Sequence, residues 1–331
     1  MSAPSPVDVV TLTLNPAIDQ TVTLDHLRPG HVHRAGSVRY DAGGKGVNVA
    51  SCLADWGLTV AAAGLLGAAN AAPFEALFAA KGIADRFRRV PGETRTNIKL
   101  LDRSSGETTD VNLPGFPAET SALAEVEADL TRLARPDGLV VLSGSLPEGA
   151  PADTYARLVK HLREAGARVV LDTSGLPLTH ALAGAPPTLV KPNRRELEVW
   201  AGRPLDDRAD LLAVAQRLCA AGIDLVVVSL GADGALFVTT DEALHAAAGE
   251  VTGGSSVGAG DAMVAGLVAG LHEGLGLGEI ARRATAFAVG KLGLPGPNLP
   301  ASAALHAIAA RVAVQPADAW AASPAVTDHA I

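Results

Sequence analysis

The chain contains the stretch Ser255-Ser256-Val257-Gly258-Ala259-Gly260-Asp261, and the apolar run Ala262-Met263-Val264-Ala265-Gly266-Leu267-Val268 follows it directly. A glycine-rich turn before such a run predicts the start of a helix. Backbone N–H groups of the turn then gather at the positive end of the helix dipole, where they can hold an anion. The Asp261 carboxylate can accept a proton from a nucleophile beside that anion. Phosphoryl transfer to an alcohol needs both functions, although an aspartate N-cap after a glycine turn gives the same pattern.

The composition of the chain indicates a soluble globular protein. It has 331 residues, of which 48% are hydrophobic and 19% charged, enough for one large domain with an appendage or for two domains. The net charge of −8 and the lack of any Lys- or Arg-rich stretch argue against nucleic-acid and membrane-surface binding. A few local cations are still sufficient to bind a phosphorylated metabolite.

The cysteines, the N-terminal residues and the length of the apolar run from Ala262 indicate where in the cell the protein is located. Cys52 and Cys219 are far apart and lack metal-ligand spacing, so we expect two buried thiols in a reducing compartment. Residues 1–10 lack a basic region followed by an apolar run, and the apolar run from Ala262 ends at His272, too short to span a membrane. We therefore expect no signal peptide and a cytoplasmic location.

Short β-branched runs alternate with segments of helical periodicity along most of the chain. The predicted strands are 9–14, 59–63, 139–142, 169–172, 188–190, 225–229 and 235–239. The predicted helices are 47–56, 72–81, 122–133, 151–164, 194–201, 207–221, 260–272 and 278–292. This alternation predicts an α/β fold with a mainly parallel central sheet that is flanked by helices on both faces.

Several predicted strands end in polar or glycine-rich sequence, and ligands of such folds bind beyond the carboxyl ends of the strands. These ends are Ser143-Gly144-Ser145, Asp172-Thr173-Ser174, Lys191-Pro192-Asn193 and Ser229-Leu230-Gly231. Two Thr- and Val-rich segments, 11–40 and 94–112, break the alternation, and we interpret them as antiparallel strands that form a small β lid or an oligomer surface. Residues 1–314 then form a single domain, and 315–331 a tail expected to be partly disordered.

A second glycine-rich turn, Gly43-Gly44-Lys45-Gly46, opens a predicted helix that also carries Asn48. Its glycines allow a ligand to approach the backbone, Lys45 offers a cation and Asn48 an amide. A turn that simply starts a helix explains the pattern equally well. The spacing does not match a Walker A loop, which has four residues between its glycines and a Ser or Thr after the Lys.

Two charged residues lie in the irregular segments. Asp19, in Asn15-Pro16-Ala17-Ile18-Asp19, can accept hydrogen bonds from sugar hydroxyls, or it is an ordinary turn aspartate. Arg95, in Thr94-Arg95-Thr96-Asn97, can grip a phosphate with two parallel hydrogen bonds, or it is an exposed strand arginine.

Asn193 and Glu196 are three residues apart at a predicted helix start. They can hold Mg²⁺ through water, because Mg²⁺ prefers oxygen ligands and keeps much of its hydration. The same spacing fits a capping box, and the two interpretations are compatible. The segment Ser229-Leu230-Gly231-Ala232-Asp233-Gly234 is typical of a hairpin turn whose glycines allow nucleotide phosphate or ribose to approach.

Taken together, these segments resemble the ribokinase-like sugar kinases of the phosphofructokinase B type. The match runs in order from Thr11 to about Leu292. The motifs that carry it are TLTLNPA at 11–17, SGSLP at 143–147, SVGAGD at 256–261 and the Asn-x-x-Glu pair. The segment LVKPNRRELEVWAGR at 189–203 and Gly-Gly-Lys-Gly at 43–46 are similar to the bacterial 1-phosphofructokinases. Ser256 stands where the family usually has Thr, and 287–300, near where relatives hold adenine, matches less well.

The resemblance implies a ribokinase-like fold and ATP-dependent phosphorylation of D-fructose 1-phosphate to fructose 1,6-bisphosphate. Asp261 is then the general base, and Gly258, Ala259 and Gly260 form the anion hole. The resemblance also implies that the sugar is bound by Asp19, Gly43, Gly44 and Asn48, and its phosphate by Lys45, Arg95 and Ser143. It implies that the nucleotide is bound by Lys191, Asn193, Ser229, Gly231, Gly234, Gly258 and Gly260. Mg²⁺ would be held through water by Asn193 and Glu196. Relatives pair through the lid, which implies a homodimer.

Alternative functions remain open at this point. Tagatose-6-phosphate kinase and 6-phosphofructokinase activities need the same motifs. A catalytically inactive sugar-phosphate-binding regulator would share the fold, but Asp261, Asn193 and Glu196 are all present, which argues against it. A dinucleotide-binding oxidoreductase is disfavoured because no Gly-x-Gly-x-x-Gly follows the first predicted strand.

Overall fold

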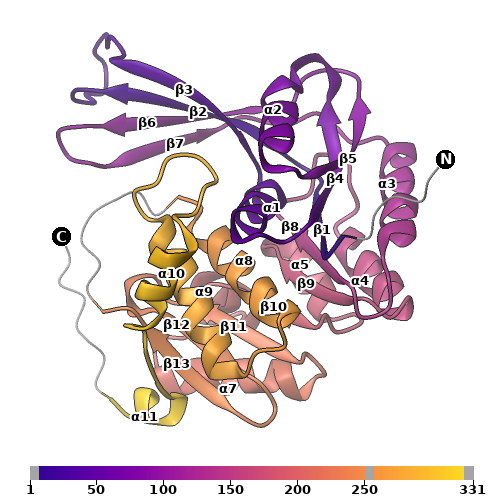
Figure 1. Cartoon of the computed structure of the whole chain (residues 1–331), viewed down its shortest axis with the longest axis vertical. Helices are drawn as coiled ribbons and strands as arrows, with labels where there is room; N and C mark the ends of the chain where they lie inside the picture. The colour runs from indigo at the N-terminus through magenta and orange to yellow at the C-terminus, as the bar shows by residue number, and fades with distance from the viewer. Residues whose placement is uncertain (1–6, 250–256, 324–331) are drawn as a thin grey trace.

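The computed structural model describes residues 7–249 and 257–323, and it contains a ten-stranded sheet in the order β14-β13-β12-β11-β10-β9-β8-β1-β4-β5 (Figure 1). The strands of this sheet are β1 (Val9–Thr13), β4 (Val60–Gly67), β5 (Ala84–Val90), β8 (Leu139–Ser143), β9 (Arg168–Asp172), β10 (Leu189–Val190), β11 (Leu225–Ser229), β12 (Ala235–Val238), β13 (Ala243–Ala247) and β14 (Ala313–Pro316). The pairs from β5 to β11 are parallel, and β12, β13 and β14 join antiparallel. The predicted mainly parallel sheet is confirmed.

Helices cover both faces of this sheet, which explains why its inner strands are apolar on both sides. One core contains residues of α1 (Lys45–Trp56), α2 (Ala72–Lys81), α8 (Ala259–His272), α9 (Leu277–Lys291) and α10 (Ser302–Ala309). The other contains residues of α3 (Thr120–Leu133), α4 (Thr154–Glu164), α5 (Gly175–Leu182), α6 (Arg194–Ala201), α7 (Arg208–Ala220) and α11 (Ala317–Ala321). The strands supply alternate residues to the two cores, for example Val9 to the first and Val10 to the second.

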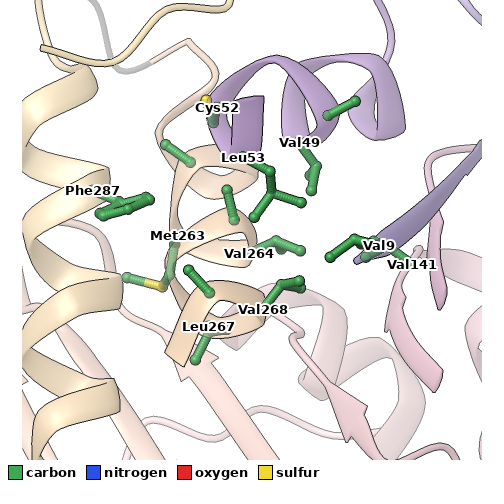
Figure 2. Close-up of a cluster of buried hydrophobic side chains, with 14 of the residues drawn as sticks. Val9, Val49, Cys52, Leu53, Val141, Met263, Val264, Leu267, Val268 and Phe287 are labelled. Atoms are coloured by element: carbon green, nitrogen blue, oxygen red, sulfur yellow. The ribbon is translucent and has the colours of Figure 1, made fainter. Parts of the chain in front are cut away.

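Helix α8 is buried along most of its length, and Figure 2 shows it between α1, α9 and the sheet. Val264 and Val268 point toward Val9 and Val141, and Met263 lies beside Phe287 (Figure 2). Gly266 allows α9 to approach, since a Cβ there would lie 2.7 Å from the Cα of Ala284. The apolar run after Asp261 is therefore a packed helix that holds the preceding turn in place.

A second sheet of four strands, in the order β3-β2-β6-β7, projects from the body at the upper left of Figure 1. Its strands are β2 (Ala17–Leu24), β3 (Ser37–Gly43), β6 (Thr96–Asp102) and β7 (Thr108–Asn112). The predicted lid is confirmed as a separate sheet, with two corrections. Residues 11–13 belong to β1 of the main sheet, and β2 pairs with β6 in parallel, although its pairing with β3 is antiparallel as expected.

The predicted strands and helices are all present, with ends shifted by a few residues. Elements without a strong sequence signal were missed, among them β5, α5, α10 and the alanine-rich β13. Within the tail that we expect to be partly disordered, residues 315–316 end β14 and residues 317–321 form α11, whose Trp320 is 3% exposed and stacks on His245. Residues 324–331 lie outside the described residues.

The two predicted buried thiols, Cys52 and Cys219, are buried and free. No helix among the residues the structure describes is long and apolar enough to cross a membrane.

Candidate active site

Asp261 occupies the first turn of α8 and is 7% exposed. Asn48, one turn into α1, donates a hydrogen bond from Nδ2 to its Oδ2 at 2.7 Å. Burial, with a contribution from Asp172, raises the pKa of Asp261 to about 6, although the Lys45 and Lys191 ammonium groups and the Asn48 amide act in the opposite direction. A carboxylate with this pKa can accept a proton near neutral pH, as a general base must.

The turn before Asp261 has the geometry expected of an anion site. Gly258 is the N-cap of α8 and has φ +81°, in the left-handed region that glycine adopts without strain. Ala259 and Gly260 follow in the first turn, where backbone N–H groups lack partners within the helix. A Cβ on Gly260 would lie 3.8 Å from Nζ of Lys191, so a cation flanks the turn on that side. Ser255 and Ser256 lie outside the described residues.

Three strand and helix ends bring Lys45, Asp172 and Lys191 together. Nζ of Lys45 lies 3.2 Å from Oδ2 of Asp172, and Nζ of Lys191 lies 3.4 Å from Oδ1. Burial acts to raise the pKa of Asp172, which is 1% exposed, but the two ammonium groups outweigh it and the pKa is lowered. Burial acts to lower the pKa of Lys45, but the carboxylates of Asp172, Asp261 and Glu196 outweigh burial, so the pKa is raised. The cluster therefore places two lysines and one ionised carboxylate beside Asp261.

The sequence alone assigns no role to Asp172. Its only local signal is its position at the carboxyl end of a predicted strand, where the sequence becomes polar. The structure shows that Asp172 holds Lys45 and Lys191, both predicted site residues, within one group of charges.

A cleft of about 400 Å³ lies between the lid and the body. Its lining includes the predicted residues Asp19, Asn48 and Gly258, and also Arg39, Asp41, Thr21, Thr23, Lys99, Leu101, Gly106, Thr108, Val257, Lys291, Gly293, Leu294, Pro295, Gly296 and Pro297. Burial raises the pKa of Asp19 despite the opposing effects of Lys99 and Asn97. Nδ2 of Asn97 donates to Oδ1 of Asp19 at 3.4 Å, and Nζ of Lys99 lies 3.8 Å from Oδ2. The cleft thus offers oxygen acceptors and cations, which suits a hydroxylated anionic ligand.

Arg39 and Lys99 were not found from the sequence. They face the cleft because Thr21 is paired with both of them across β2, β3 and β6, so the three side chains share one face of the lid. A strand register of this kind carries no local sequence signal.

Gly43 and Gly44 lie where close packing requires glycine. A Cβ on Gly43 would lie 2.9 Å from Oδ2 of Asp19, so Gly43 lets that carboxylate approach the backbone. Gly44 has φ +111°, and a Cβ there would meet Thr13 Cγ2 at 2.9 Å. Both predicted sugar-binding glycines are therefore also explained by the local fold.

Arg95 and Ser143 are not among the residues that line this cleft. The Arg95 guanidinium donates to the backbone carbonyls of Asn15, Pro16 and Leu113 at 3.3 Å each, and burial lowers its pKa. The Ser143 hydroxyl is fully buried and has no hydrogen-bond partner among the described residues. Lys45 also lies outside the lining, but its side chain is 38% exposed.

A second groove, of about 390 Å³, lies at the carboxyl ends of β10 and β11. Its lining includes the predicted nucleotide residues Asn193, Ser229 and Gly231, together with Arg194, Arg195, Leu230, Ala232 and Asp233. The predicted hairpin turn is confirmed, with the 3₁₀ turn η2 (Gly231–Asp233) between β11 and β12. Gly234 has φ +86°, and a Cβ there would lie 2.0 Å from the carbonyl oxygen of Ala246, so this glycine is required by packing.

Asn193 and Glu196 form the capping box of α6. The Glu196 amide donates to Oδ1 of Asn193 at 2.8 Å, and the Asn193 amide donates to Oε2 of Glu196 at 2.9 Å. No group of three or more His, Cys, Asp or Glu among the described residues could hold a metal directly. Asn193 lines the second groove, and oxygen donors such as those of Asn193 and Glu196 fit Mg²⁺ held through water.

Comparisons with known proteins agree with this geometry. A family model described as "pfkB family carbohydrate kinase" matches residues 9–304. The chain is 57% identical to a 1-phosphofructokinase of Xanthomonas campestris pv. campestris over 86% of this chain and 91% of that protein. It is 49% identical to a 1-phosphofructokinase of Rhodobacter capsulatus over 93% of this chain and 97% of that protein. The crystal structure of phosphofructokinase-2 from Escherichia coli in complex with potassium superposes with a TM-score of 0.87 at 30% identity, covering 92% of this chain and 98% of that one.

Proposed function

Because the chain belongs to the pfkB family of carbohydrate kinases, we propose that it transfers the γ-phosphoryl group of ATP to the 6-hydroxyl of D-fructose 1-phosphate. The products are fructose 1,6-bisphosphate and ADP. One observation carries the proposal: the buried Asp261 carboxylate lies at the N-terminus of α8, next to a cleft of polar and cationic side chains. The names of the curated relatives support the choice of the 1-phosphate as acceptor.

In the proposed reaction Asp261 accepts the proton of the 6-hydroxyl as that oxygen attacks the γ-phosphorus. A new O–P bond forms, the bond to the β-phosphate oxygen breaks, and ADP leaves. The backbone N–H groups of Gly258, Ala259 and Gly260 stabilise the charge on the transferring group. Asn48 orients the Asp261 carboxylate through the 2.7 Å hydrogen bond.

The sugar phosphate lies in the cleft under the lid in this proposal. Asp19 and Asn48 orient its hydroxyl groups, and Gly43 and Gly44 let it approach the backbone. The resemblance assigns its 1-phosphate to Lys45, Arg95 and Ser143, although none of the three lines the cleft. The structure favours the cleft residues Lys99 and Arg39 as additional partners, because their side chains line the cleft whereas Arg95 donates to backbone carbonyls.

The nucleotide lies in the groove beside α6, which Asn193, Ser229 and Gly231 line. Lys191, Gly234, Gly258 and Gly260, which lie outside that lining, are its further proposed contacts. Asn193 and Glu196 would hold Mg²⁺ through water. When bound, Mg²⁺ would neutralise charge on the phosphates of ATP. Residues 1–314 act as one kinase domain in this proposal.

We also propose that two copies of the chain pair through the lid. Residues paired across the lid strands share a face, and one face carries Val22, Val38, Tyr40, Ile98, Leu100 and Val111. Val38, Tyr40 and Val111 are 45%, 59% and 44% exposed, and the opposite face lines the cleft. An apolar, half-exposed sheet face is suited to burial against a second copy.

The proposed function is tested by steady-state kinase assays with ATP and Mg²⁺. Fructose 1-phosphate, fructose 6-phosphate and tagatose 6-phosphate are compared side by side. We expect kcat/KM for fructose 1-phosphate to exceed the other values by about tenfold or more, a difference of about 1.4 kcal/mol in transition-state binding. A preference for either 6-phosphate would assign the chain to one of the alternative kinase activities. Binding of all three without turnover would indicate the inactive regulator.

A further inference from the structure

Lys291 is a buried lysine that the proposed chemistry leaves without a role. It is the last residue of α9 and is 4% exposed. Nζ of Lys291 donates to the carbonyl oxygen of Leu294 at 2.7 Å, and no carboxylate of the described residues lies within 4.0 Å of it. An ammonium group has three donors, and a buried charge is costly unless it is paired. The structure thus contains a cation with capacity for an anion.

The position of Lys291 relative to the anion turn shows which anion this could be. A Cβ on Gly258 would lie 3.2 Å from Cε of Lys291 and 3.9 Å from its Nζ. Lys191 lies at a similar distance from the other end of the turn, beside Gly260. Two lysines from different elements, α9 and the segment after β10, therefore flank the turn whose N–H groups face an incoming anion.

Lys291 also lines the cleft under the lid, together with Asp19, Asn48 and Gly258. Its ammonium group interacts electrostatically with Asp261 as well as with Asp41 and Arg39. It therefore lies where the sugar cleft meets the turn, which is the place where a phosphoryl group passes from nucleotide to sugar in the proposed function.

We propose that Lys291 is a further catalytic residue, whose ammonium group binds the phosphoryl group during its transfer at the Gly258–Gly260 turn. This inference rests on the proposed function. Negative charge on the transferring oxygens is stabilised by fixed positive groups in a site that excludes water. Lys291 adds such a group on the Gly258 side, opposite Lys191.

The competing interpretation is structural: a lysine at a helix C-terminus that satisfies a loop carbonyl and the helix dipole. Lys81 provides a matched control for it. Nζ of Lys81 also contacts the loop after α9, at 3.4 Å from the Pro297 carbonyl oxygen, but it pairs with Asp55 and does not line the cleft.

The experiment compares Lys291→Met and Lys81→Met with the wild-type enzyme. We expect Lys291→Met to lower kcat by about 100-fold, as loss of one group that stabilises the transferring charge does, with KM for the sugar phosphate and the unfolding midpoint nearly unchanged. Its affinity for ADP with aluminium fluoride and the sugar phosphate, a mimic of the transferring group, should fall by a similar factor, with ADP binding unaffected. Lys81→Met should leave kcat within about twofold. A Lys291→Met enzyme with kcat within about threefold of wild type overturns the inference.

A second variant keeps the test decisive if Lys291→Met is poorly folded. Lys291→Ala leaves space for a small cation, and we expect ammonium chloride to raise its kcat by about tenfold over sodium chloride of equal ionic strength. Equal rates in both salts contradict the inference. Wild-type activity is measured first: an inactive wild-type chain counts against the proposed function, whereas an active wild type with an active Lys291→Met counts only against the role of Lys291.

Discussion

At the residue scale, the environment of Asp261 combines opposing effects. Burial and the Asp172 carboxylate favour the protonated form, whereas Lys45, Lys191 and Asn48 favour the ionised form. Asp172 itself remains ionised because the two lysines contact it directly. Asp261 is thus the carboxylate of the pair that can exchange a proton near neutral pH, and Asp172 the one that holds cations.

The first prediction concerns Asp261→Asn, which keeps the shape and removes the base. We expect kcat to fall by about 10²–10⁴-fold, the usual contribution of a general base, with little change in the unfolding midpoint. Steady-state assays and thermal unfolding measure the two quantities. Asp210→Asn, which removes a surface partner of Arg203, is the control and should keep kcat. A near-normal kcat for Asp261→Asn would rule out its role as base.

The second prediction is a pH dependence. Because Asp261 must be ionised to accept a proton and its raised pKa is about 6, kcat/KM should fall as the pH drops below about 6. Asn48→Ala removes a hydrogen bond that favours the ionised form, so the acidic limb should move to higher pH. The pH–rate profiles of both enzymes test this. An acidic limb that stays in place or moves to lower pH in the variant contradicts the coupling.

At the element scale, close packing against β1 fixes the position of the first turn of α1. Helix α1 begins at Lys45, directly after β3, and Gly46 lies against the end of β1. A Cβ on Gly46 would lie 2.4 Å from the Leu12 carbonyl oxygen and 2.5 Å from Oγ1 of Thr13. This contact holds the first turn of α1 against the sheet, so that Asn48 faces Asp261 on α8.

The third prediction is that Gly46→Ala destabilises the fold by about 1–3 kcal/mol, the range for an added methyl group in a packed core. Chemical denaturation measures the change, and kcat should fall as well because α1 moves. Gly278→Ala on α9 is the matched control. A Cβ there has only an ordinary contact, 3.9 Å from Leu244, and the change should stabilise by about 0.4–1 kcal/mol. Equal stabilities of the two variants would contradict the packing argument.

At the scale of the whole molecule, the two faces of the lid sheet differ in their chemistry. One face lines the cleft with polar and charged residues, and the other presents Val38, Tyr40 and Val111. The alternation of side chains along paired strands produces both faces from the same short segments. A second copy on the apolar face would stabilise the lid without blocking the cleft.

The fourth prediction is that the wild-type chain has twice its 33.5 kDa mass in solution and that Val38→Glu shifts it toward the single chain. A charge on the half-exposed apolar face is costly to bury at an interface. Light scattering at assay concentration measures the mass. Val32→Glu is the control, because Val32 is 95% exposed in the β2–β3 loop, outside the paired strands. A wild-type monomer, or a Val38→Glu dimer as stable as wild type, rejects the lid interface.

Much of the fold could be predicted from the sequence, because its signals are local. The continuous apolar run of α8, the glycine turn that ends at Asp261 and the capping box of Asn193 and Glu196 depend on residues a few positions apart. Weak local signals caused the misses: β13 is mostly alanine, and α11 is too short for a helical period to show.

The sequence by itself determined the alternation of strands and helices, the two glycine turns and the identity of the proposed base. Only the tertiary structure decided which of these meet: Asn48 reaches Asp261 over 213 positions, and Lys45 reaches Asp172 over 127. It also brought Lys291 to Gly258, and Arg39 and Lys99 into the cleft. Such contacts depend on strand order, register and the crossing of helices. These are properties of the folded chain as a whole, since no local pattern encodes which distant segment a side chain will face.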